Sequence, residues 1–328
     1  MFRSSNIQDG CIDYKDIVRV NKKVRENLIT KNGDLLICAR NGSSRLIGKN
    51  ALLHRTDANQ TFGAFMMVFR SDKNHFVHHL LNTKRYTSQV AENLGARINQ
   101  ITSSDLSSFR FFFPKDDKEM TRIASLFDLL DGRIAVQNRL IDRLQSLMIG
   151  IRHRIINEAK GKIVCLCEVS DIYQPQTISS ADLTETGYPV YGANGIIGHY
   201  TSYNHEAEQV CITCRGNTCG GVNYTKSKSW ITGNAMVVNV DRYQNIVSKR
   251  YLYHYLSNCD FNSIISGSGQ PQIVRAPLAK FKIILPTVMQ QYKIAHCLDV
   301  IQNKINVNSN ILNLLIRQKQ YLLRKMFI

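Results

Sequence analysis

The chain has 328 residues, and 42 Lys and Arg against 25 Asp and Glu give a formal net charge of +17. This length suits two ordinary domains, and the balance of 44% apolar and 20% charged residues is that of a globular protein rather than a disordered one. No apolar run approaches the ~20 residues of a membrane helix, and the first residues lack the apolar core of an export signal. We therefore expect a cytoplasmic protein whose positive charge serves a polyanion, and nucleic acid fits better than a membrane surface.

The first half predicts a mixed α/β domain over residues 1–115. Short apolar or alternating runs bounded by Gly, Asn, Ser or Pro predict strands at 35–40, 64–70 and 110–114, and helical spacing predicts a helix at 75–86. The loop after the first strand, ARNGSSRLIGKN, mixes cations and amides with small residues that let backbone amides approach phosphates. A solvated polar turn is the alternative for this loop. Its predicted DNA-binding residues are Arg40, Asn41, Ser43, Ser44, Arg45 and Lys49.

A long helix is predicted over residues 116–158. Its apolar positions repeat at alternating steps of three and four residues, the pattern of a coiled-coil seam. The seam residues are Ile123, Leu126, Leu130, Ile134, Gln137, Ile141, Leu144, Met148, Ile151 and Ile155. At ~1.5 Å per residue, about thirty residues form a rod of about 45–50 Å.

The second half predicts another α/β domain over residues 159–287. Strands are expected at 209–215, 235–240 and 281–286, with a helix at 248–259. The loop CRGNTCGGVNYTKSKSW has the same mixture of residue types as the first loop, and amide and guanidinium groups of this kind can read base edges. The predicted DNA-binding residues of this half are Tyr191, Asn194, Arg215, Asn217, Thr218, Asn223, Lys226, Lys228, Ser268, Gln270 and Gln272.

A second long helix is predicted over residues 288–328, again with a heptad seam. The seam residues are Ile294, Leu298, Ile301, Ile305, Asn308, Leu312, Leu315, Lys319, Leu322 and Met326. At an offset of 171 residues the two seams coincide, and Gln137 falls on Asn308. An amide in a seam lowers stability but fixes register and partner choice, so we expect the helices to pair with each other. Packing of each helix on its own domain is the alternative.

The two halves are a duplication. LSSFRFFFP (Leu106–Pro114) matches LAKFKIILP (Leu278–Pro286), and GARINQIT (Gly95–Thr102) matches GSGQPQIV (Gly267–Val274), both 172 positions apart. Further upstream the offset is 175, which superposes GDLLICARNG on EQVCITCRGN and Arg40 on Arg215. Solenoid repeats are far shorter than this period, so the repeat indicates duplicated domains.

Motifs of independent catalysis are missing from the sequence. GSSRLIGKN departs from a phosphate-binding loop in its glycine spacing and has Asn50 where Ser or Thr would hold Mg²⁺. Cys211, Cys214 and Cys219 are close in sequence, but residues three apart in a strand point to opposite faces, so free thiols are favoured over zinc. His78, His79 and His254 lie on apolar helices and are interpreted as structural. We therefore predict no catalytic residue, no metal and no cofactor on this chain.

Several motifs in a fixed order resemble the specificity subunits of type I restriction–modification systems, the HsdS family. YPVYGANGIIGHY, CRGNTCGG and WITGNAMVV resemble their target-recognition domain. GSGQPQIVRAPLAKFKIILP and QQYKIAHCLDVIQNKI resemble the end of that domain and the helix that follows it. The first half repeats the last part as INQITSSDLSSFRFFFP and MTRIASLFDLLDGRIAVQNRLIDRL. The likeness covers nearly the whole chain and is strongest from about Thr186 onward.

The resemblance implies a non-catalytic subunit whose two recognition domains each read half of a split target in double-stranded DNA. Its two helices would pair antiparallel as a spacer and dock two modification subunits, which bind S-adenosylmethionine and methylate adenine. A restriction subunit using ATP and Mg²⁺ can join that complex. The second domain has a segment, about Lys162 to Gly187, with almost no counterpart in the first, which we therefore expect to be shortened at its N-terminal side. A free-standing DNA-modifying enzyme and a helix scaffold with degenerate heads are the alternatives.

Overall fold

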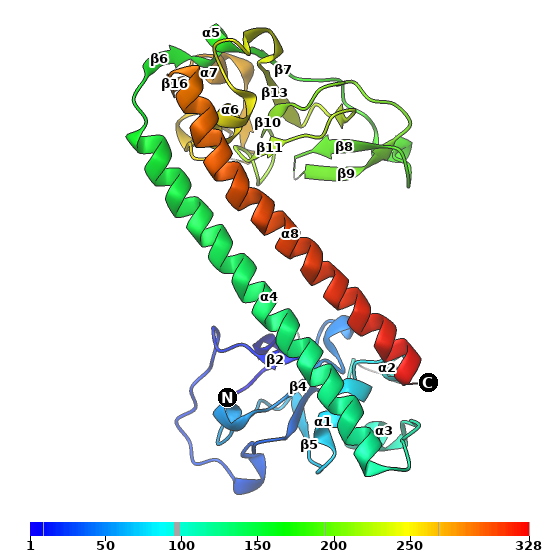
Figure 1. Ribbon diagram of the computed structural model, residues 1–328. Coiled ribbons are helices and arrows are strands. Elements are labelled where there is room, and N and C mark those ends of the chain that lie inside the picture. The colour runs from blue at the N-terminus through cyan, green and yellow to red at the C-terminus, as the bar shows by residue number, and fades with distance from the viewer. Residues whose placement is uncertain (9, 95–98, 194, 268, 328) are drawn as a thin grey trace. The chain divides into compact units, whose positions relative to one another are not determined.

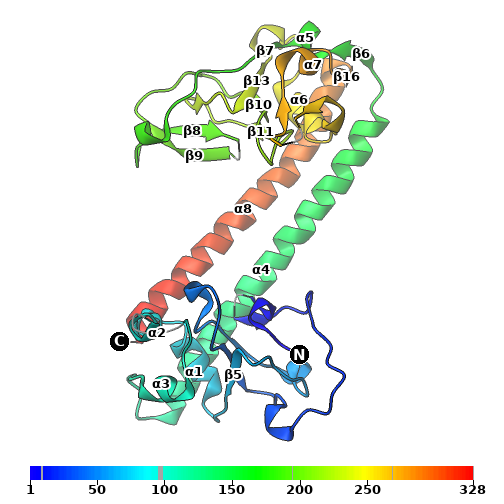
Figure 2. The ribbon, with the colours of Figure 1, turned by 180° about the vertical axis from the view of Figure 1, so that it is seen from behind.

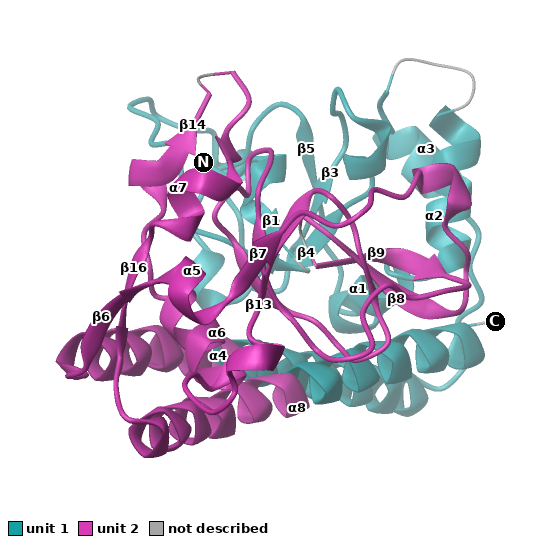
Figure 3. Ribbon diagram, turned by 90° about the horizontal axis from the view of Figure 1, so that it is seen from above, with its two compact units in different colours: residues 1–139, 309–328 teal, residues 140–308 magenta. Residues whose placement is uncertain are grey.

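The computed structural model describes residues 1–8, 10–94, 99–193, 195–267 and 269–327. The chain divides into two compact units, coloured separately in Figure 3. Unit 1 comprises residues 1–139 and 309–328, and unit 2 comprises residues 140–308. The domains predicted from the sequence separate heads from helices, whereas these compact units divide each long helix between them.

Unit 1 is built on a three-stranded antiparallel sheet. Its strand order is β4 (Asn50–Leu52), β3 (Leu35–Cys38), β5 (Met66–Phe69). Helix α1 (Asn74–Leu80) packs on β4 and α2 (Lys84–Leu94) follows it. The four side chains of β3 are all buried, which explains its uninterrupted apolar sequence. The remaining elements of this unit's head are the short pair β1 (Ile7–Gln8) and β2 (Cys11–Ile12), helix α3 (Ser103–Ser108), and the 3-10 turns η1 (Ser4–Asn6), η2 (Glu26–Leu28), η3 (Ser44–Leu46) and η4 (Arg55–Asp57).

Unit 2 contains a four-stranded antiparallel sheet in the order β11 (Val222–Tyr224), β10 (Val210–Thr213), β13 (Ala235–Asn239), β7 (Asp171–Tyr173). Helix α6 (Lys249–Leu256) packs on β11 and begins after Ser248, whose side chain accepts a hydrogen bond from Tyr251 N and so caps the helix. A second sheet has the order β12 (Trp230–Ile231), β8 (Tyr188–Gly192), β9 (Gly195–Tyr200). The smaller elements are β6 (Lys162–Cys165), α5 (Leu166–Val169), η5 (Ser180–Asp182), η6 (Asp241–Tyr243), η7 (Asn262–Ile264), β14 (Ile265–Ser266), β15 (Gln272–Ile273), α7 (Arg275–Ala279) and β16 (Lys282–Leu285).

The two units repeat one topology, as the sequence predicted. The order β4-β3-β5 in unit 1 corresponds to β11-β10-β13 in unit 2, and α1 corresponds to α6. The register is also repeated. Leu35 pairs with Leu52 and Phe69, and its equivalent Val210 pairs with Tyr224 and Val238. A conserved register keeps the same positions of the two central strands facing the core.

Two long helices run through both units, α4 (Asp117–Glu158) and α8 (Val288–Met326). In unit 1 the beginning of α4 shares a core with the end of α8, where Phe127 packs with Leu323. In unit 2 the later part of α4 meets the earlier part of α8, where Met148 packs with Leu298 and Ile305. The helices are therefore antiparallel, and they lie side by side in both views (Figures 1 and 2). The predicted mixed α/β fold with paired long helices is confirmed.

Each predicted seam is wrong at one end. Leu126 is 38% exposed, and Phe127 takes its place with 0% exposure. Met326 is 37% exposed, and Leu323 is buried instead. Both exceptions lie in unit 1, where the helices also pack on α1 through Phe76. Here each long helix packs against both the head and the partner helix, so its buried face is wider than a heptad seam with two positions. This is why Phe127 and Leu323 are buried and the predicted seam residues beside them are not.

The strand predicted at residues 110–114 is also wrong, because this segment has no regular secondary structure. Its equivalent in unit 2, β16, pairs with β6 along four residues. No described segment pairs with residues 110–114 in this way. Side chains satisfy the backbone of Arg110 instead: its N–H donates to Gln89 Oε1 at 2.8 Å, and its carbonyl accepts from Arg85 Nε at 2.8 Å.

Among the described residues, no helix combines the length and the apolar character needed to cross a bilayer.

Candidate nucleic-acid interface

Backbone hydrogen bonds fix the start of the loop that follows the central strand of unit 1. Ala39 N donates to Phe65 O at 2.9 Å, and Ala39 O accepts from Ile101 N at 2.8 Å. One residue further on, Asn41 N donates to Asn99 O at 3.3 Å. The chain segment around residue 100 thus runs beside the start of the loop, and Arg40 and Gln100 form an isolated antiparallel bridge.

Unit 2 has the same frame at the equivalent residues. Cys214 N donates to Asn234 O at 3.0 Å, and Cys214 O accepts from Ile273 N at 3.0 Å. Gly216 N donates to Pro271 O at 3.0 Å, and Gly216 has a φ of +85°, which a glycine adopts without strain. Arg215 and Gln272 form the isolated bridge that corresponds to the one between Arg40 and Gln100.

This frame brings together residues that are far apart in sequence. In each unit, an exposed arginine that follows the central strand lies beside a glutamine about sixty residues later. Arg40, Arg215 and Gln272 were predicted from the sequence as DNA-binding residues, but Gln100 was not. The signal was present, because the repeat at offset 172 superposes Gln100 on Gln272.

Two further positions escaped the sequence analysis. Phe65 in unit 1 and Asn234 in unit 2 accept the equivalent backbone hydrogen bonds and are both exposed, Phe65 by 55%. The guanidinium of Arg40 lies over the Phe65 ring, 5.2 Å from its centroid, which is cation–π geometry. Strand pairing alone relates Phe65 to Asn234, at an offset of 169, and the sequence comparison did not use that offset.

The other predicted residues of unit 1 surround this frame. Ser43, Ser44 and Arg45 are exposed in the loop, where Ser44–Leu46 forms a 3-10 turn. Asn41 is half-buried: its side chain donates to Ser4 Oγ at 3.0 Å and accepts from Ser43 N at 2.9 Å. Asn41 therefore stabilises the loop, while Ser43, Ser44 and Arg45 are exposed and accessible to a ligand.

The predicted residues of unit 2 fall into two groups. Asn217 and Thr218 are exposed in the turn between β10 and β11, directly after Arg215. Lys226 and Lys228 follow β11 and so lie at its opposite end, since β10 and β11 are antiparallel. Asn223 is half-buried within β11, opposite Cys211.

Tyr191 is buried in β8, and its hydroxyl accepts a hydrogen bond from Lys226 N at 3.1 Å. It leaves little surface for a ligand. Gln270 is exposed two residues before Gln272. Asn194 and Ser268, together with residues 95–98 of the matched repeat, lie outside the described residues.

A second duplicated constellation joins each head to its long helix. In unit 2, Asp299 of α8 accepts from Arg250 Nε at 3.0 Å and lies 2.8 Å from His254 Nε2. In unit 1, the equivalent Asp128 of α4 lies 2.9 Å from His79 Nε2 and 3.1 Å from His75 Nδ1. We call these two groups the aspartate clamps.

The charges of the clamps follow from their surroundings. Burial raises the pKa of Asp299, but hydrogen bonds from Arg250 and His254 outweigh it and the pKa is lowered overall. Burial also lowers the pKa of His254 to about 4. His79 and His254 are both 0% exposed, as expected of structural histidines.

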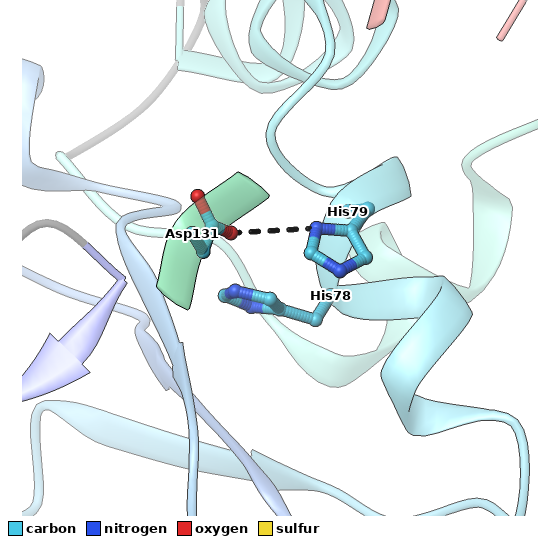
Figure 4. Close-up of side chains that lie close together, drawn as sticks. All are labelled: His78, His79 and Asp131. Carbon is cyan, nitrogen blue, oxygen red and sulfur yellow. Dashed lines mark ion pairs between the residues drawn. The ribbon is translucent and has the colours of Figure 1, made fainter. Parts of the chain in front are cut away.

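His78, His79 and Asp131 form a separate cluster, shown in Figure 4. Their potential ligand atoms all lie within 4.8 Å of one another, and His79 Nδ1 is 3.8 Å from Asp131 Oδ2. His78 Nδ1 lies 3.1 Å from Asn50 Oδ1, and burial lowers the pKa of His78 to about 3. Lys319 Nζ lies 2.5 Å from Asp131 Oδ1 and supplies the positive charge that an ion would bring, so we assign no metal here.

The cysteines of unit 2 are free thiols. Cys211 is buried in β10, and burial raises the pKa of its thiol above the usual range. Cys214 is buried just after the strand, with Sγ 3.5 Å from Gly233 O. In the described part of the chain, these thiols do not converge with histidines or carboxylates into a possible metal site.

Comparisons with known proteins show which proteins this chain is similar to. Residues 159–317 match a family model described as the Type I restriction modification DNA specificity domain. The Type I restriction enzyme EcoprrI specificity subunit of Escherichia coli is 31% identical over 148 residues, 44% of this chain and 36% of that protein. A putative type I restriction enzyme specificity subunit of Haemophilus influenzae is 30% identical over 142 residues, 40% of this chain and 36% of that protein. The matched region thus spans little more than a third of either relative.

Solved structures show the same fold. The crystal structure of the S subunit of a type I restriction–modification system from M. genitalium superposes with a TM-score of 0.69 at 17% identity, covering 100% of this chain and 92% of that one. A chain from a study of complex assembly and conformational transition of the type I system gives 0.53 at 18% identity, covering 90% of this chain and 82% of that one. Residues 159–317 therefore carry the DNA specificity domain of type I restriction–modification systems, and these matches confirm the resemblance to HsdS specificity subunits seen in the motifs.

Proposed function

We propose that this chain selects the DNA site at which a type I complex acts, with each unit reading one half of a split target. The observation that carries the proposal is the duplicated frame. In both units the same backbone hydrogen bonds present an exposed arginine beside a glutamine. Two equivalent surfaces on one chain suit a target made of two separate parts.

The chemistry of these surfaces suits DNA. The chain carries a net charge of +17, and neutralising phosphates supplies much of the affinity of a protein for DNA. Arginine can donate two hydrogen bonds to guanine and glutamine can pair with adenine in the major groove. Arg40, Ser43, Ser44 and Arg45 on unit 1 and Arg215, Asn217 and Thr218 on unit 2 are exposed and available for both tasks.

The long helices offer a surface for partner subunits. Besides its seam, each helix has an exposed apolar stripe whose spacing places the side chains on one helical face. On α4 the stripe is Leu129, Val136, Leu140 and Leu147, and on α8 it is Val300, Val307, Ile311, Leu314 and Tyr321. Exposed apolar stripes of this length mark protein interaction sites. We propose that they dock two modification subunits, and that the paired helices set the spacing between the half-sites.

Catalysis would then belong to the partners. In this proposal the chain itself is not an enzyme and binds no cofactor. The modification subunits bind S-adenosylmethionine and methylate adenine, and a translocating restriction subunit that uses ATP and Mg²⁺ can join them. The complex would act in the cytoplasm, where its DNA lies.

The test is to co-express the chain with the modification subunit of its own system and to sequence the methylated positions of host DNA. A split motif with a fixed gap is the expected result. A single uninterrupted half-motif would show that only one unit reads DNA. A stable complex that methylates nothing would favour the scaffold alternative, and methyl transfer by the purified chain alone would overturn its non-catalytic assignment.

A further inference from the structure

The duplicated frame separates the positions that build the loop from the positions that face outward. Its hydrogen bonds use backbone atoms alone, so the side chains at the framed positions can differ between the units without disturbing the geometry. The arginine and the glutamine are the same in both units. Of the framed positions whose residue types differ between the units, the one that is exposed in both is Phe65 in unit 1 and Asn234 in unit 2.

We infer that Phe65 and Asn234 determine how the two half-sites of the target differ. This inference rests on the proposed function and adds the residues that set its base preference. Each residue is exposed and accepts a backbone hydrogen bond from the residue just before the framed arginine. Each is therefore fixed in place at the backbone, while its side chain stays free to meet a ligand.

The two side chains would recognise different base edges. Phenylalanine offers only apolar contact, for which the methyl group of thymine is the partner in the major groove. Asparagine can form two hydrogen bonds with the N6 and N7 edge of adenine. In unit 1 the ring of Phe65 also lies under Arg40, which restricts the directions that the guanidinium can take. Unit 2 has an asparagine in that place, so Arg215 has no such platform at this position.

The experiment exchanges the two side chains in the assembled complex. Phe65→Asn and Asn234→Phe are each co-expressed with the modification subunit, and the methylated motif is sequenced. Phe65→Asn is expected to change the base preference of one half-motif, and Asn234→Phe that of the other, with the gap unchanged. The preference at the affected position should shift at least about fivefold, since a good base contact discriminates by about 1–3 kcal/mol.

Matched controls come from the same units. Phe112 is also exposed and lies under an arginine, with Arg85 4.7 Å from its ring centroid, but it makes none of the hydrogen bonds of the frame. Phe112→Asn should leave the motif unchanged. Asn262 is an exposed asparagine of unit 2 outside the frame, and Asn262→Phe serves in the same way.

The possible outcomes distinguish a failure of the inference about Phe65 and Asn234 from a failure of the proposed function. If the unaltered chain yields no split motif, the proposed function fails. If the unaltered chain yields a split motif and both exchanges leave it intact, the inference is overturned while the function stands. If an exchanged complex assembles but does not methylate, duplexes that it retains are selected from a library with randomised half-sites. An unchanged selected half-site would then overturn the inference as well.

Discussion

Both heads contain buried histidines, and their protonation links the stability of the protein to pH. His78 and His254 are buried on equivalent head helices, and burial lowers their pKa values to about 3 and about 4. In the unfolded chain, both histidines would titrate near 6.5. Between about pH 6.5 and the folded pKa values, the folded state therefore binds fewer protons than the unfolded state. The free energy of unfolding must decrease as the pH is lowered through that range.

We expect the free energy of unfolding to decrease by about 2 kcal/mol for each of these histidines between pH 7 and pH 5. The measurement is urea unfolding at several pH values. His254→Gln cannot be protonated and should lose its share of the pH dependence, whereas the exposed His296→Gln should not. A slope that is unchanged in the His254 variant would contradict a neutral buried histidine.

The two aspartate clamps should contribute unequally. Asp299 is less exposed than Asp128, and its partner Arg250 keeps a permanent charge. Asp299→Asn leaves that cation without its carboxylate and should cost about 2 kcal/mol, while Asp128→Asn should cost less than about 1 kcal/mol because its partners are histidines and one of them is exposed. Thermal unfolding of both variants, with the exposed Asp142→Asn as control, checks the order. An equal loss in the two variants would refute it.

The long helices show how far a sequence pattern determines an element. The heptad pattern predicted both helices and most of the seam, because a helical stripe needs only local spacing. It misplaced Leu126 and Met326, since the buried face there also depends on the head packed against it. It predicted a strand at 110–114 from composition, but a strand exists only with a partner, which local sequence does not specify.

The seam amides provide a test of register. Asn308 is buried, and its side chain donates to Lys304 O at 2.7 Å. Replacing both Gln137 and Asn308 with Leu should raise the thermal stability of the pair and loosen its alignment, because a polar seam position trades stability for register. The readout is the gap between methylated half-motifs, which should become variable. A fixed gap and unchanged assembly in the double variant would refute the register role.

The exposed stripe can be tested apart from the seam. Val307→Glu with Leu314→Glu introduces two charges on side chains that are 56% and 62% exposed, so the fold should persist. Co-purification with the modification subunit should fall at least tenfold, because each buried charge would lack a partner. Circular dichroism checks the helices, and Asn310→Glu with Arg317→Glu changes exposed positions outside the stripe as control. Undiminished co-purification would place the docking surface elsewhere.

At the scale of the whole molecule, the duplication predicted which positions of the two frames are equivalent, which no single motif did. The offset of 175 residues superposes Arg40 on Arg215, and the two arginines form equivalent bridges in the structure. The duplication did not reveal the aspartate clamps, although His79 and His254 share one offset and Asp128 and Asp299 another. Polar pairs across two elements are determined by how those elements pack, and that packing was accessible only from the three-dimensional arrangement.

Unit 1 should depend on residues at the far end of the chain. Leu322, Leu323 and Phe327 pack against Phe76 and the beginning of α4. Deleting residues 309–328 should expose that core, at about 1.5–3 kcal/mol for each buried apolar side chain. Hydrogen exchange should then show lost protection in α1 and residues 120–130, with β10 and β13 unaffected. Retained protection in α1 would contradict the dependence.

The same division has a consequence for synthesis on the ribosome. Unit 2 is one continuous stretch, residues 140–308, and can complete its core as soon as that stretch has emerged. Unit 1 needs the last twenty residues of the chain as well as the first 139. The head that is translated first therefore completes its core after the second one, because its apolar surface on α1 stays uncovered until residues 309–328 have been synthesised.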